Sequence, residues 1–369
     1  MMEKVPFIDL NYQTKLIKKN VLNQWNKILD NSSFVLSEDL KNFEDKFSQY
    51  SKIEYSTGVG NGGDAIEFLL RSLRLSKNST VYLPVNTFIA TATAVSRAGY
   101  KIKFVDVNQS DGLMSYEALL NYKIKKIDAI IPVHLFGSML DIKELKNSLD
   151  SDVKLLEDAS QAHGATFRSD PPGKHSYGAT YSFYPGKNLG AFGDGGIVNT
   201  NSKQIDKNIK LLRNYGSLKK YKHDLIGFNS RLDPLQAIVL KEKLKHLNNW
   251  NKMRRHNFDV YKKLLEDVPQ IQFLEIPEFS NSVFHLTVVK VKKRQELINY
   301  LQDKNISTII HYPYPLHKTK AYASYKHRDN EFINSEMLAR KILSLPNYPG
   351  MENSKIEYVC SEIKRFYKK

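Results

Sequence analysis

Short runs of apolar, strand-forming residues alternate with amphipathic helical stretches between about residues 55 and 200. The strand-like runs are VYLPV, KIKFVDV, DAIIPVHL, KLLEDAS, ATYSFY and GGIVNT. The helical stretches between the earlier runs are DAIEFLLRSL, TATAVSRAG and IKELKNSL. Apolar strands that alternate with helices are typical of a mostly parallel sheet covered on both faces. The pattern therefore predicts an α/β fold.

The pattern changes in the last third of the chain. A long helical pattern runs from about Pro234 to Leu265, and it is followed by FHLTVVKV, a helix near Gln295 to Lys304, STIIHY and terminal helices. This mixture predicts a smaller C-terminal α+β domain. We place the boundary near Asn249, which gives a large α/β domain at 1–249 and a small domain at 250–369.

The composition limits the class of protein. The 369 residues include one cysteine, Cys360, so no intrachain disulfide can form. The first residues, MMEKVPFIDLNYQTK, carry charges where a secretory signal needs an apolar run, and no stretch is apolar enough for a membrane span. We therefore expect a cytoplasmic protein with no membrane partner.

The net charge of +16 raises the question of nucleic-acid binding. However, the lysines are spread along amphipathic helices such as KEKLKHLNNWNKMRRHNF, and no recognition module is present. We expect no nucleic-acid partner, and an anionic small substrate would also suit the charge.

One lysine stands in an unusual setting, the stretch SFYPGKNLGAFGDGG. Lys187 could be a surface charge, a phosphate ligand or an amine nucleophile. The P-loop pattern is not met, because Asn188 follows the lysine in place of Ser or Thr. The apolar neighbours would favour a neutral, nucleophilic amine. The nucleophile interpretation therefore stays open.

A second motif, GVGNGG, formally matches the dinucleotide-binding pattern and precedes a helix. That interpretation requires an acidic residue at the end of the next strand, and VYLPVNTF has none. Gly62, Gly63 and Asp64 at a helix N-terminus could instead present backbone amides to a phosphate. A tight turn without a ligand remains an alternative.

A carboxylate, Asp158 of LLEDASQAHGA, follows an apolar strand at the edge where α/β sheets bind ligands. It could be a helix cap, or it could keep the ring nitrogen of pyridoxal phosphate protonated. Gln161 could then bond the ring hydroxyl. Ser182 could join Gly62 and Gly63 at the phosphate, and Phe88 could offer a flat face to the ring.

These motifs, together with NTFIATATAV, PVHLFG, LRNYG and GFNSRLDPLQA, closely resemble the DegT/DnrJ/StrS family of pyridoxal-phosphate-dependent nucleotide-sugar aminotransferases. The resemblance implies the type I aminotransferase fold and a homodimer with two shared active sites. It also implies that Lys187 forms the Schiff base with pyridoxal 5'-phosphate and that Asp158 contacts the pyridine nitrogen. Gln161 would contact the ring hydroxyl, while Ser182 and, from the other subunit, Asn229 would bind the phosphate.

The stretches SFYPGKNLGAFGDGG and LRNYGSLKKY resemble those of enzymes that act at carbon 3 of a dTDP-3-oxo-6-deoxyhexose. The resemblance thus implies amino transfer from L-glutamate in the synthesis of an amino sugar for a surface polysaccharide or a glycosylated product. A carbon-4 aminotransferase of the same family and a nicotinamide-dependent dehydrogenase are the alternatives.

Several further residues are candidates for contacts with the sugar. By resemblance these are His311, Tyr312 and His317, with core packing as the alternative. Tyr184, beside the lysine, could contact the substrate or simply fill space. His163 is interpreted as a structural imidazole. Gly63 stands where relatives commonly carry Thr, which removes a hydroxyl from the phosphate corner. No metal site is expected.

Overall fold

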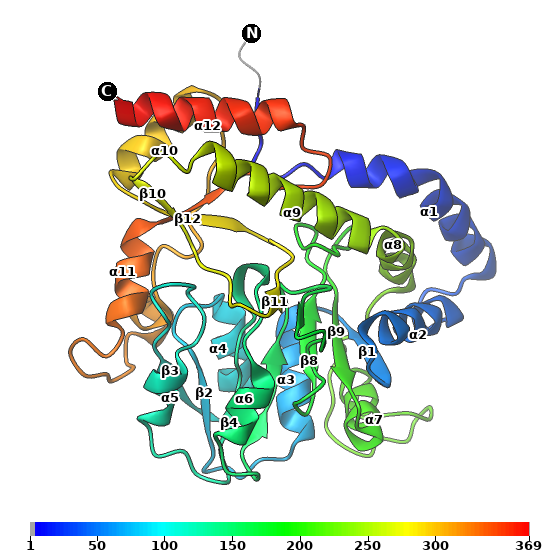
Figure 1. Ribbon diagram of the computed structural model, residues 1–369. Coiled ribbons are helices and arrows are strands. Elements are labelled where there is room, and N and C mark those ends of the chain that lie inside the picture. The colour runs from blue at the N-terminus through cyan, green and yellow to red at the C-terminus, as the bar shows by residue number, and fades with distance from the viewer. Residues whose placement is uncertain (1–3, 369) are drawn as a thin grey trace.

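A computed structural model describes residues 4–368 of the chain (Figure 1). Its centre is a sheet in two hydrogen-bonded sections, with strand orders β1-β9-β8-β6 and β3-β2-β4-β5. The two sections are continuous because only Leu156 separates β5 from β6. The strands are β1 (Tyr55–Val59), β2 (Thr80–Pro84), β3 (Lys101–Val105), β4 (Ala129–Ile130), β5 (Lys154–Leu155), β6 (Glu157–Asp158), β8 (Ala179–Ser182) and β9 (Gly196–Thr200).

The predicted, mostly parallel sheet is confirmed. Strand β2 pairs in parallel with β3 and β4, β4 with β5, and β6 with β8. Only β9 runs against its neighbours, since it is antiparallel to both β1 and β8. Consequently β1 runs in the same direction as the parallel strands. The C-terminal ends of β1, β2, β6 and β8 therefore lie along one edge of the sheet.

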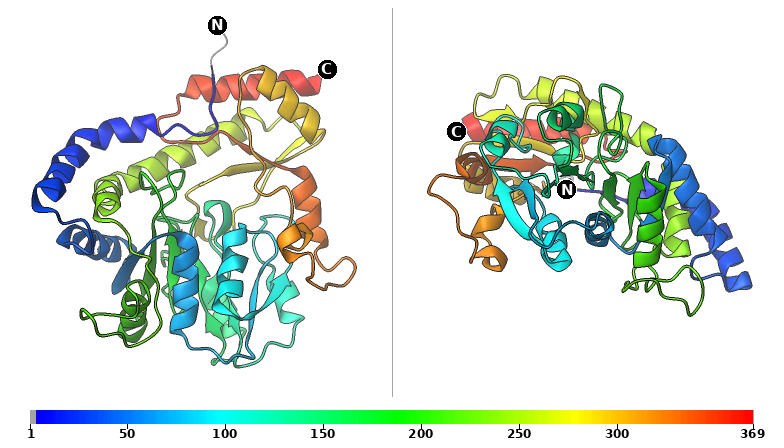
Figure 2. Two further views of the ribbon diagram at one scale, coloured as in Figure 1. Left: turned by 180° about the vertical axis from the view of Figure 1, so that it is seen from behind. Right: turned by 90° about the horizontal axis from the view of Figure 1, so that it is seen from below.

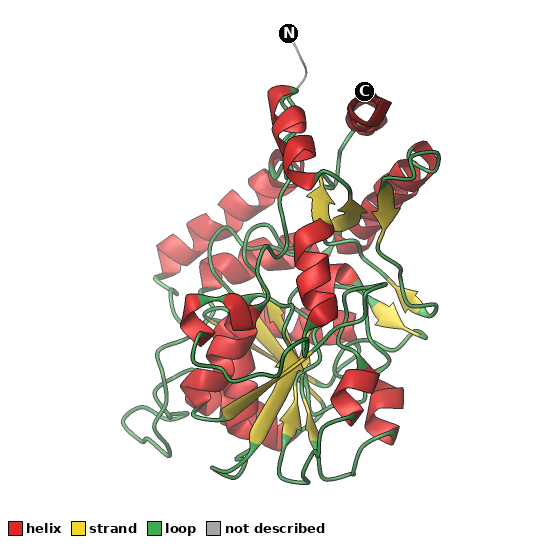
Figure 3. Cartoon of the chain, turned by 90° about the vertical axis from the view of Figure 1, so that its left-hand side faces the viewer, coloured by secondary structure: helices red, strands yellow, loops and turns green. Residues whose placement is uncertain are grey.

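Helices cover both faces of this sheet (Figure 3). They are α2 (Glu38–Ser51), α3 (Gly62–Ser72), α4 (Ile89–Ala98), α5 (Tyr116–Leu120), α6 (Ile142–Asn147) and α7 (Lys203–Leu212). Helix α1 (Asn11–Asn31) lies further out and packs on α8 (Pro234–Leu244). Alternating residues of β2 enter different cores: Val81 and Leu83 pack with α3 and α4, whereas Tyr82 packs with α5 and α6. Both faces are therefore buried, as the apolar strand pattern requires.

The C-terminal part contains a small antiparallel sheet in the order β10-β12-β13. Its elements are α8 (Pro234–Leu244), α9 (Leu247–Leu264), β10 (Ile271–Phe273), β12 (Thr287–Val291), α10 (Arg294–Asp303), α11 (Ile333–Lys341), β13 (Ile342–Leu345) and α12 (Asn353–Lys368). A separate two-stranded pair joins β7 (Thr166–Phe167) to β11 (Ser280–Asn281). The views in Figure 2 show α9, α10 and α12 gathered on one side of the large sheet.

The long helical pattern predicted from Pro234 to Leu265 is two helices, α8 and α9, with a break at Lys245 and His246. Asn249 lies inside α9. The division into 1–249 and 250–369 stays a prediction. No helix among residues 4–368 is long and apolar enough to cross a membrane.

Candidate active site

A glycine brings two elements into close contact at one corner of the site. Helix α3 begins at Gly62, and the side chain of Asn61 caps it by accepting the Asp64 amide at 2.9 Å. A Cβ atom on Gly62 would lie 2.6 Å from the Cβ of Ser182, at the end of β8. Only a residue without a side chain allows this approach. The free first turn of α3 and the Ser182 hydroxyl therefore lie side by side.

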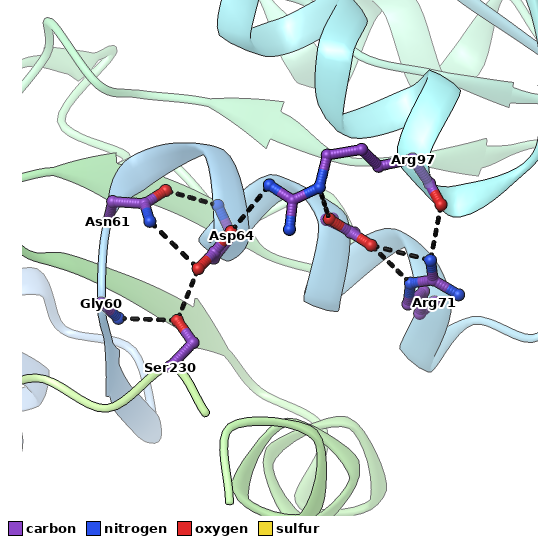
Figure 4. Close-up of polar contacts among 7 residues, drawn as sticks. Gly60, Asn61, Asp64, Arg71, Arg97 and Ser230 are labelled. Carbon is purple, nitrogen blue, oxygen red and sulfur yellow. Dashed lines mark hydrogen bonds and ion pairs between the residues drawn. The ribbon is translucent and has the colours of Figure 1, made fainter. Parts of the chain in front are cut away.

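The carboxylate of Asp64, in the first turn of α3, makes several polar contacts (Figure 4). Its Oδ2 accepts Ser230 Oγ at 2.6 Å and Asn61 Nδ2 at 3.0 Å, and its Oδ1 lies 3.0 Å from Arg97 Nη1. Arg97 also pairs with the buried Glu67 at 2.9 Å. The Asp64 side chain thus stabilises the first turn of α3. The first backbone amides of this helix face Ser182.

Asp158 lies at the end of β6 and is only 4% exposed. Thr91 Oγ1, from α4, donates to its Oδ2 at 2.8 Å, and the Ser160 amide donates to its Oδ1 at 3.1 Å. Two donors hold this carboxylate in a fixed orientation, so it can stabilise a positive charge or a proton placed beside it.

Gln161 links this edge to the C-terminal part of the chain. Its Oε1 accepts the Phe136 amide at 2.7 Å, and its Nε2 donates to the Tyr312 hydroxyl at 3.1 Å. The Tyr312 ring lies 6.0 Å from the ring of Phe88. Burial and, less strongly, the Asp158 charge raise the pKa of Tyr312, so this phenol stays protonated. Phe88, Gln161 and Tyr312 therefore form one group beside Asp158.

Lys187 follows β8 in a turn closed by its own amide, which donates to the Tyr184 carbonyl at 2.9 Å. Removal of its ammonium from water lowers the pKa of Lys187 to about 8, although the nearby Asp158 charge acts in the opposite direction. An amine with this pKa is partly neutral near pH 7 and can act as a nucleophile or base. The exposed ring of Tyr184 lies at the same turn.

Three imidazoles lie close enough to Lys187 to interact with its charge. Burial and then the Lys187 charge lower the pKa of His163 to about 3, that of His311 to about 4, and that of His285 well below its ordinary value. All three are therefore neutral near pH 7. His311 also contacts Ser344 Oγ at 2.9 Å, and His163 is buried against the rings of Tyr181 and Phe183.

Two predicted residues lie apart from this group. The main chain of the exposed Asn229 pairs with that of Asn214. Asn229 does not cap α8, because Asp233 is at the N-cap position, where it makes no side-chain hydrogen bond. His317 is buried beside Phe332 and lies 3.1 Å from Glu336. Neither residue has a contact in residues 4–368 that joins it to Asp158 or Lys187.

Thr91, Asn188 and His285 are polar contacts of the site to which the sequence analysis assigned no role. Thr91 lies within NTFIATATAV and Asn188 directly follows Lys187, so for these two residues the motifs were a usable signal. His285 comes from a strand-like run nearly a hundred residues after Lys187, and only the fold brings it close.

The residues present fit pyridoxal 5'-phosphate. The corner of Gly62 and Ser182 offers amides and a hydroxyl to a phosphate. The fixed, buried Asp158 suits a protonated ring nitrogen, and Lys187 supplies an amine of lowered pKa. This combination suits a pyridoxal-phosphate enzyme with an α/β fold.

Comparison with known proteins agrees with this conclusion. Residues 15–364 match the model of the DegT/DnrJ/EryC1/StrS aminotransferase family. The chain therefore belongs to this family of pyridoxal-phosphate-dependent aminotransferases, which confirms the predicted fold, enzyme class and cofactor. Membership of this family also excludes the alternative function, that of a nicotinamide-dependent dehydrogenase.

Individual relatives cover nearly the whole chain. A dTDP-3-amino-3,6-dideoxy-alpha-D-galactopyranose transaminase of Aneurinibacillus thermoaerophilus is 36% identical and covers 98% of this chain and 99% of its own. A pleiotropic regulatory protein of Geobacillus stearothermophilus is 34% identical, with 99% of both chains covered. The crystal structure of S. venezuelae DesV with a ketimine intermediate is 34% identical, with 99% of both chains covered and a TM-score of 0.95.

Proposed function

We propose that this enzyme transfers an amino group from L-glutamate to carbon 3 of a dTDP-linked 3-oxo-6-deoxyhexose, as a step in the synthesis of an amino sugar. The observation that carries the proposal is the amine of Lys187, whose pKa is lowered to about 8 beside the fixed carboxylate of Asp158. The carbon-3 position and the dTDP carrier rest on similarity to the A. thermoaerophilus transaminase.

The assignment of residues to the cofactor is part of this proposal. Lys187 would bind it covalently, and Asp158 and Gln161 would hold the ring nitrogen and the ring hydroxyl. The amides of Gly62 and Gly63 and the hydroxyl of Ser182 would hold the phosphate. Phe88 would offer its flat face to the ring, and Asp64 supports the turn. When bound, pyridoxal phosphate supplies an electron sink for charge that develops at the reacting carbon.

The protein's own residues move and hold the protons. Once its amine is free of the cofactor, the neutral form of Lys187 would take a proton from one of the two carbons bonded to the transferred nitrogen, and the resulting ammonium would deliver it to the other. The carboxylate of Asp158, held by Thr91 and Ser160, would favour the protonated ring nitrogen. The neutral imidazoles of His163 and His311 lack the basicity to take the proton from Lys187. Proton transfer is therefore confined to Lys187.

The sugar is proposed to lie against Tyr184 and against the segment that carries His311 and Tyr312. Tyr184 is 61% exposed at the lysine turn, so a large part of its ring is available to a ligand. Tyr312 is connected to the ring-hydroxyl ligand Gln161. The contacts of His317 with Glu336 and Phe332 favour a packing role for that residue, although the family resemblance favours a substrate role.

We also propose a homodimer whose two active sites are shared through Asn229. Two groups of exposed apolar side chains support the proposal that a second subunit covers part of this surface. They are Leu16, Leu22 and Leu29 on α1, and Leu218, Tyr221 and Ile226 on the loop that leads to Asn229. Apolar side chains that are grouped on a surface favour association with another protein chain. A cytoplasmic location is proposed from the single cysteine.

The experiment that tests the substrate is an assay of the purified enzyme, loaded with pyridoxal phosphate, against 3-oxo and 4-oxo hexoses linked to dTDP or UDP. The proposal predicts that L-glutamate is consumed fastest with a dTDP-3-oxo-6-deoxyhexose. A preference for a 4-oxo sugar would support the carbon-4 alternative and overturn the carbon-3 assignment. A chain without turnover on any of these sugars would contradict the proposed function.

A further inference from the structure

The side chain of Asn188, the residue after Lys187, has a defined orientation. Its Nδ2 donates to the Val283 carbonyl at 3.0 Å and to Asn251 Oδ1 at 2.9 Å. A backbone carbonyl can only accept a hydrogen bond, so the atom facing Val283 must be the amide nitrogen. The oxygen of Asn188 therefore faces the other neighbour, the Nδ1 atom of His285, at 3.1 Å.

This orientation fixes the tautomer of His285. Because the Asn188 oxygen has no hydrogen to give, Nδ1 of His285 must carry the proton and donate it. The Nε2 atom then carries a lone pair if the ring is neutral. The charged and titratable groups that act on this ring are Lys187, Arg254, His311 and His163. Burial and then the positive charges of Lys187 and Arg254 lower the pKa of His285 well below its ordinary value.

The main chain around His285 is also held. Arg254 Nη1, from α9, donates to the His285 carbonyl at 3.3 Å and to the Asn347 carbonyl at 2.6 Å. Asn251, one turn earlier on α9, donates to the His163 carbonyl at 2.8 Å. The turn that carries Lys187 is thus tied through Asn188 to α9 and to the segment before β12.

We propose that His285 is a positioning residue for Lys187. Its neutral imidazole donates to Asn188, holds the lysine turn against the C-terminal part of the chain, and excludes water from the amine. A neutral ring does not compete for the proton that Lys187 carries. The inference rests on the proposed role of Lys187, but the bond to Asn188 and the effect on the lysine amine are properties of the cofactor-free chain.

The test compares three variants. His285→Leu removes the donor, and His285→Asn keeps an N–H near the position of Nδ1. The control is His256→Leu, which breaks another histidine–asparagine contact, the exposed one between His256 and Asn353 at 3.2 Å. In each cofactor-free protein, acetylation of Lys187 is followed against pH by mass spectrometry of the peptide that contains it. This measurement gives the pKa of the amine without any turnover.

We expect His285→Leu to raise the pKa of Lys187 by about one pH unit as water reaches the amine, and to lower kcat by roughly 10- to 100-fold once cofactor is added. His285→Asn should restore most of both properties, and His256→Leu should change neither. Equal pKa values of Lys187 in His285→Leu, in His256→Leu and in the unchanged protein would overturn the proposal.

A second measurement remains decisive if His285→Leu fails to fold. Nitrogen-15 spectra of the unchanged, cofactor-free protein report which ring nitrogen of His285 carries hydrogen. The proposal requires a neutral ring protonated at Nδ1 near pH 7, and a ring protonated at Nε2 or at both atoms contradicts it. Failure of the proposed sugar reaction would leave this result unaffected, so the two failures are distinguishable.

Discussion

The carboxylate of Asp158 is the residue whose chemistry is most constrained by its neighbours. Both of its oxygens already accept a hydrogen bond, from Thr91 and from the Ser160 amide. Asp158→Asn places an uncharged amide, with one nitrogen facing a donor, in the position of a negative charge. We expect a loss of roughly 10²- to 10³-fold in kcat, measured at saturating substrates with the cofactor content of each sample determined.

The exposed Asp152→Asn provides a control for the loss of one negative charge elsewhere. If Asp158→Asn retained near-normal turnover with normal cofactor content, Asp158 would be structural only.

At the same scale, the sequence analysis could select candidate residues only where they lie in local motifs. Lys187, Asp158, Gln161 and Ser182 each stand next to a strand end, and the fold places them at one edge of the sheet. Their supporting contacts were not predictable, because Phe136, Tyr312 and His285 reach them from other parts of the chain. Contacts of this kind depend on tertiary packing, which no local pattern encodes.

At the scale of the elements, the approach of α3 to β8 depends on Gly62. Gly62→Ala would place a Cβ 2.6 Å from that of Ser182, so the first turn of α3 and the strand end must separate. We expect the affinity for pyridoxal phosphate to fall by about tenfold or more, because the amides and the hydroxyl no longer converge. Equilibrium dialysis of the cofactor measures this change.

Gly63→Ala is the matched control. A Cβ there meets only the Asn61 side-chain oxygen at 3.2 Å and the Ala90 Cβ at 3.9 Å. It should therefore bind cofactor with an affinity close to that of the unchanged protein. Equal affinities of the two alanine variants would show that the phosphate lies elsewhere.

Element types were predicted better than their ends and directions. Apolar strands that alternate with helices indicate a parallel sheet, but the reversed direction of β9 leaves no trace in local composition. The break between α8 and α9 was missed because its sequence contains neither Gly nor Pro. The last turn of α8 is held by a tertiary contact, because the buried Lys243 donates a hydrogen bond to the Gly190 carbonyl at 2.7 Å.

At the scale of the whole molecule, buried histidines make stability depend on pH. The pKa of His163 is about 3 in the folded chain and about 6.5 when unfolded, so between these values the unfolded chain binds more protons. Stability must therefore fall as pH decreases through this range, by about 1.4 kcal/mol per pH unit for each such histidine.

His163→Phe removes the titrating group between the rings of Tyr181 and Phe183. We expect the decrease in unfolding free energy between about pH 7.5 and about pH 5 to be smaller in the variant by about 2 kcal/mol. Urea unfolding at both pH values checks this difference. An identical pH dependence in the two proteins would mean that His163 is not buried in its neutral form.

The proposed shared site predicts complementation between two inactive chains. If Asn229 serves the partner's cofactor phosphate, then Lys187→Ala and Asn229→Ala fall in the same site of a mixed dimer, and the other site carries neither change. We expect activity above that of either parent after subunit exchange, measured as glutamate-dependent turnover. If mixed dimers form without recovered activity, Asn229 acts within its own subunit.

The central claim is that Lys187 carries out amino transfer to a nucleotide sugar. Its most direct test is a single-turnover reaction of the enzyme, loaded with pyridoxamine phosphate, with a dTDP-3-oxo-6-deoxyhexose, followed by mass spectrometry of the sugar. The account predicts that the unchanged enzyme converts the ketone to an amine, whereas Lys187→Ala binds the cofactor through its phosphate and forms no amino sugar. Equal yields of amino sugar from both proteins would contradict it.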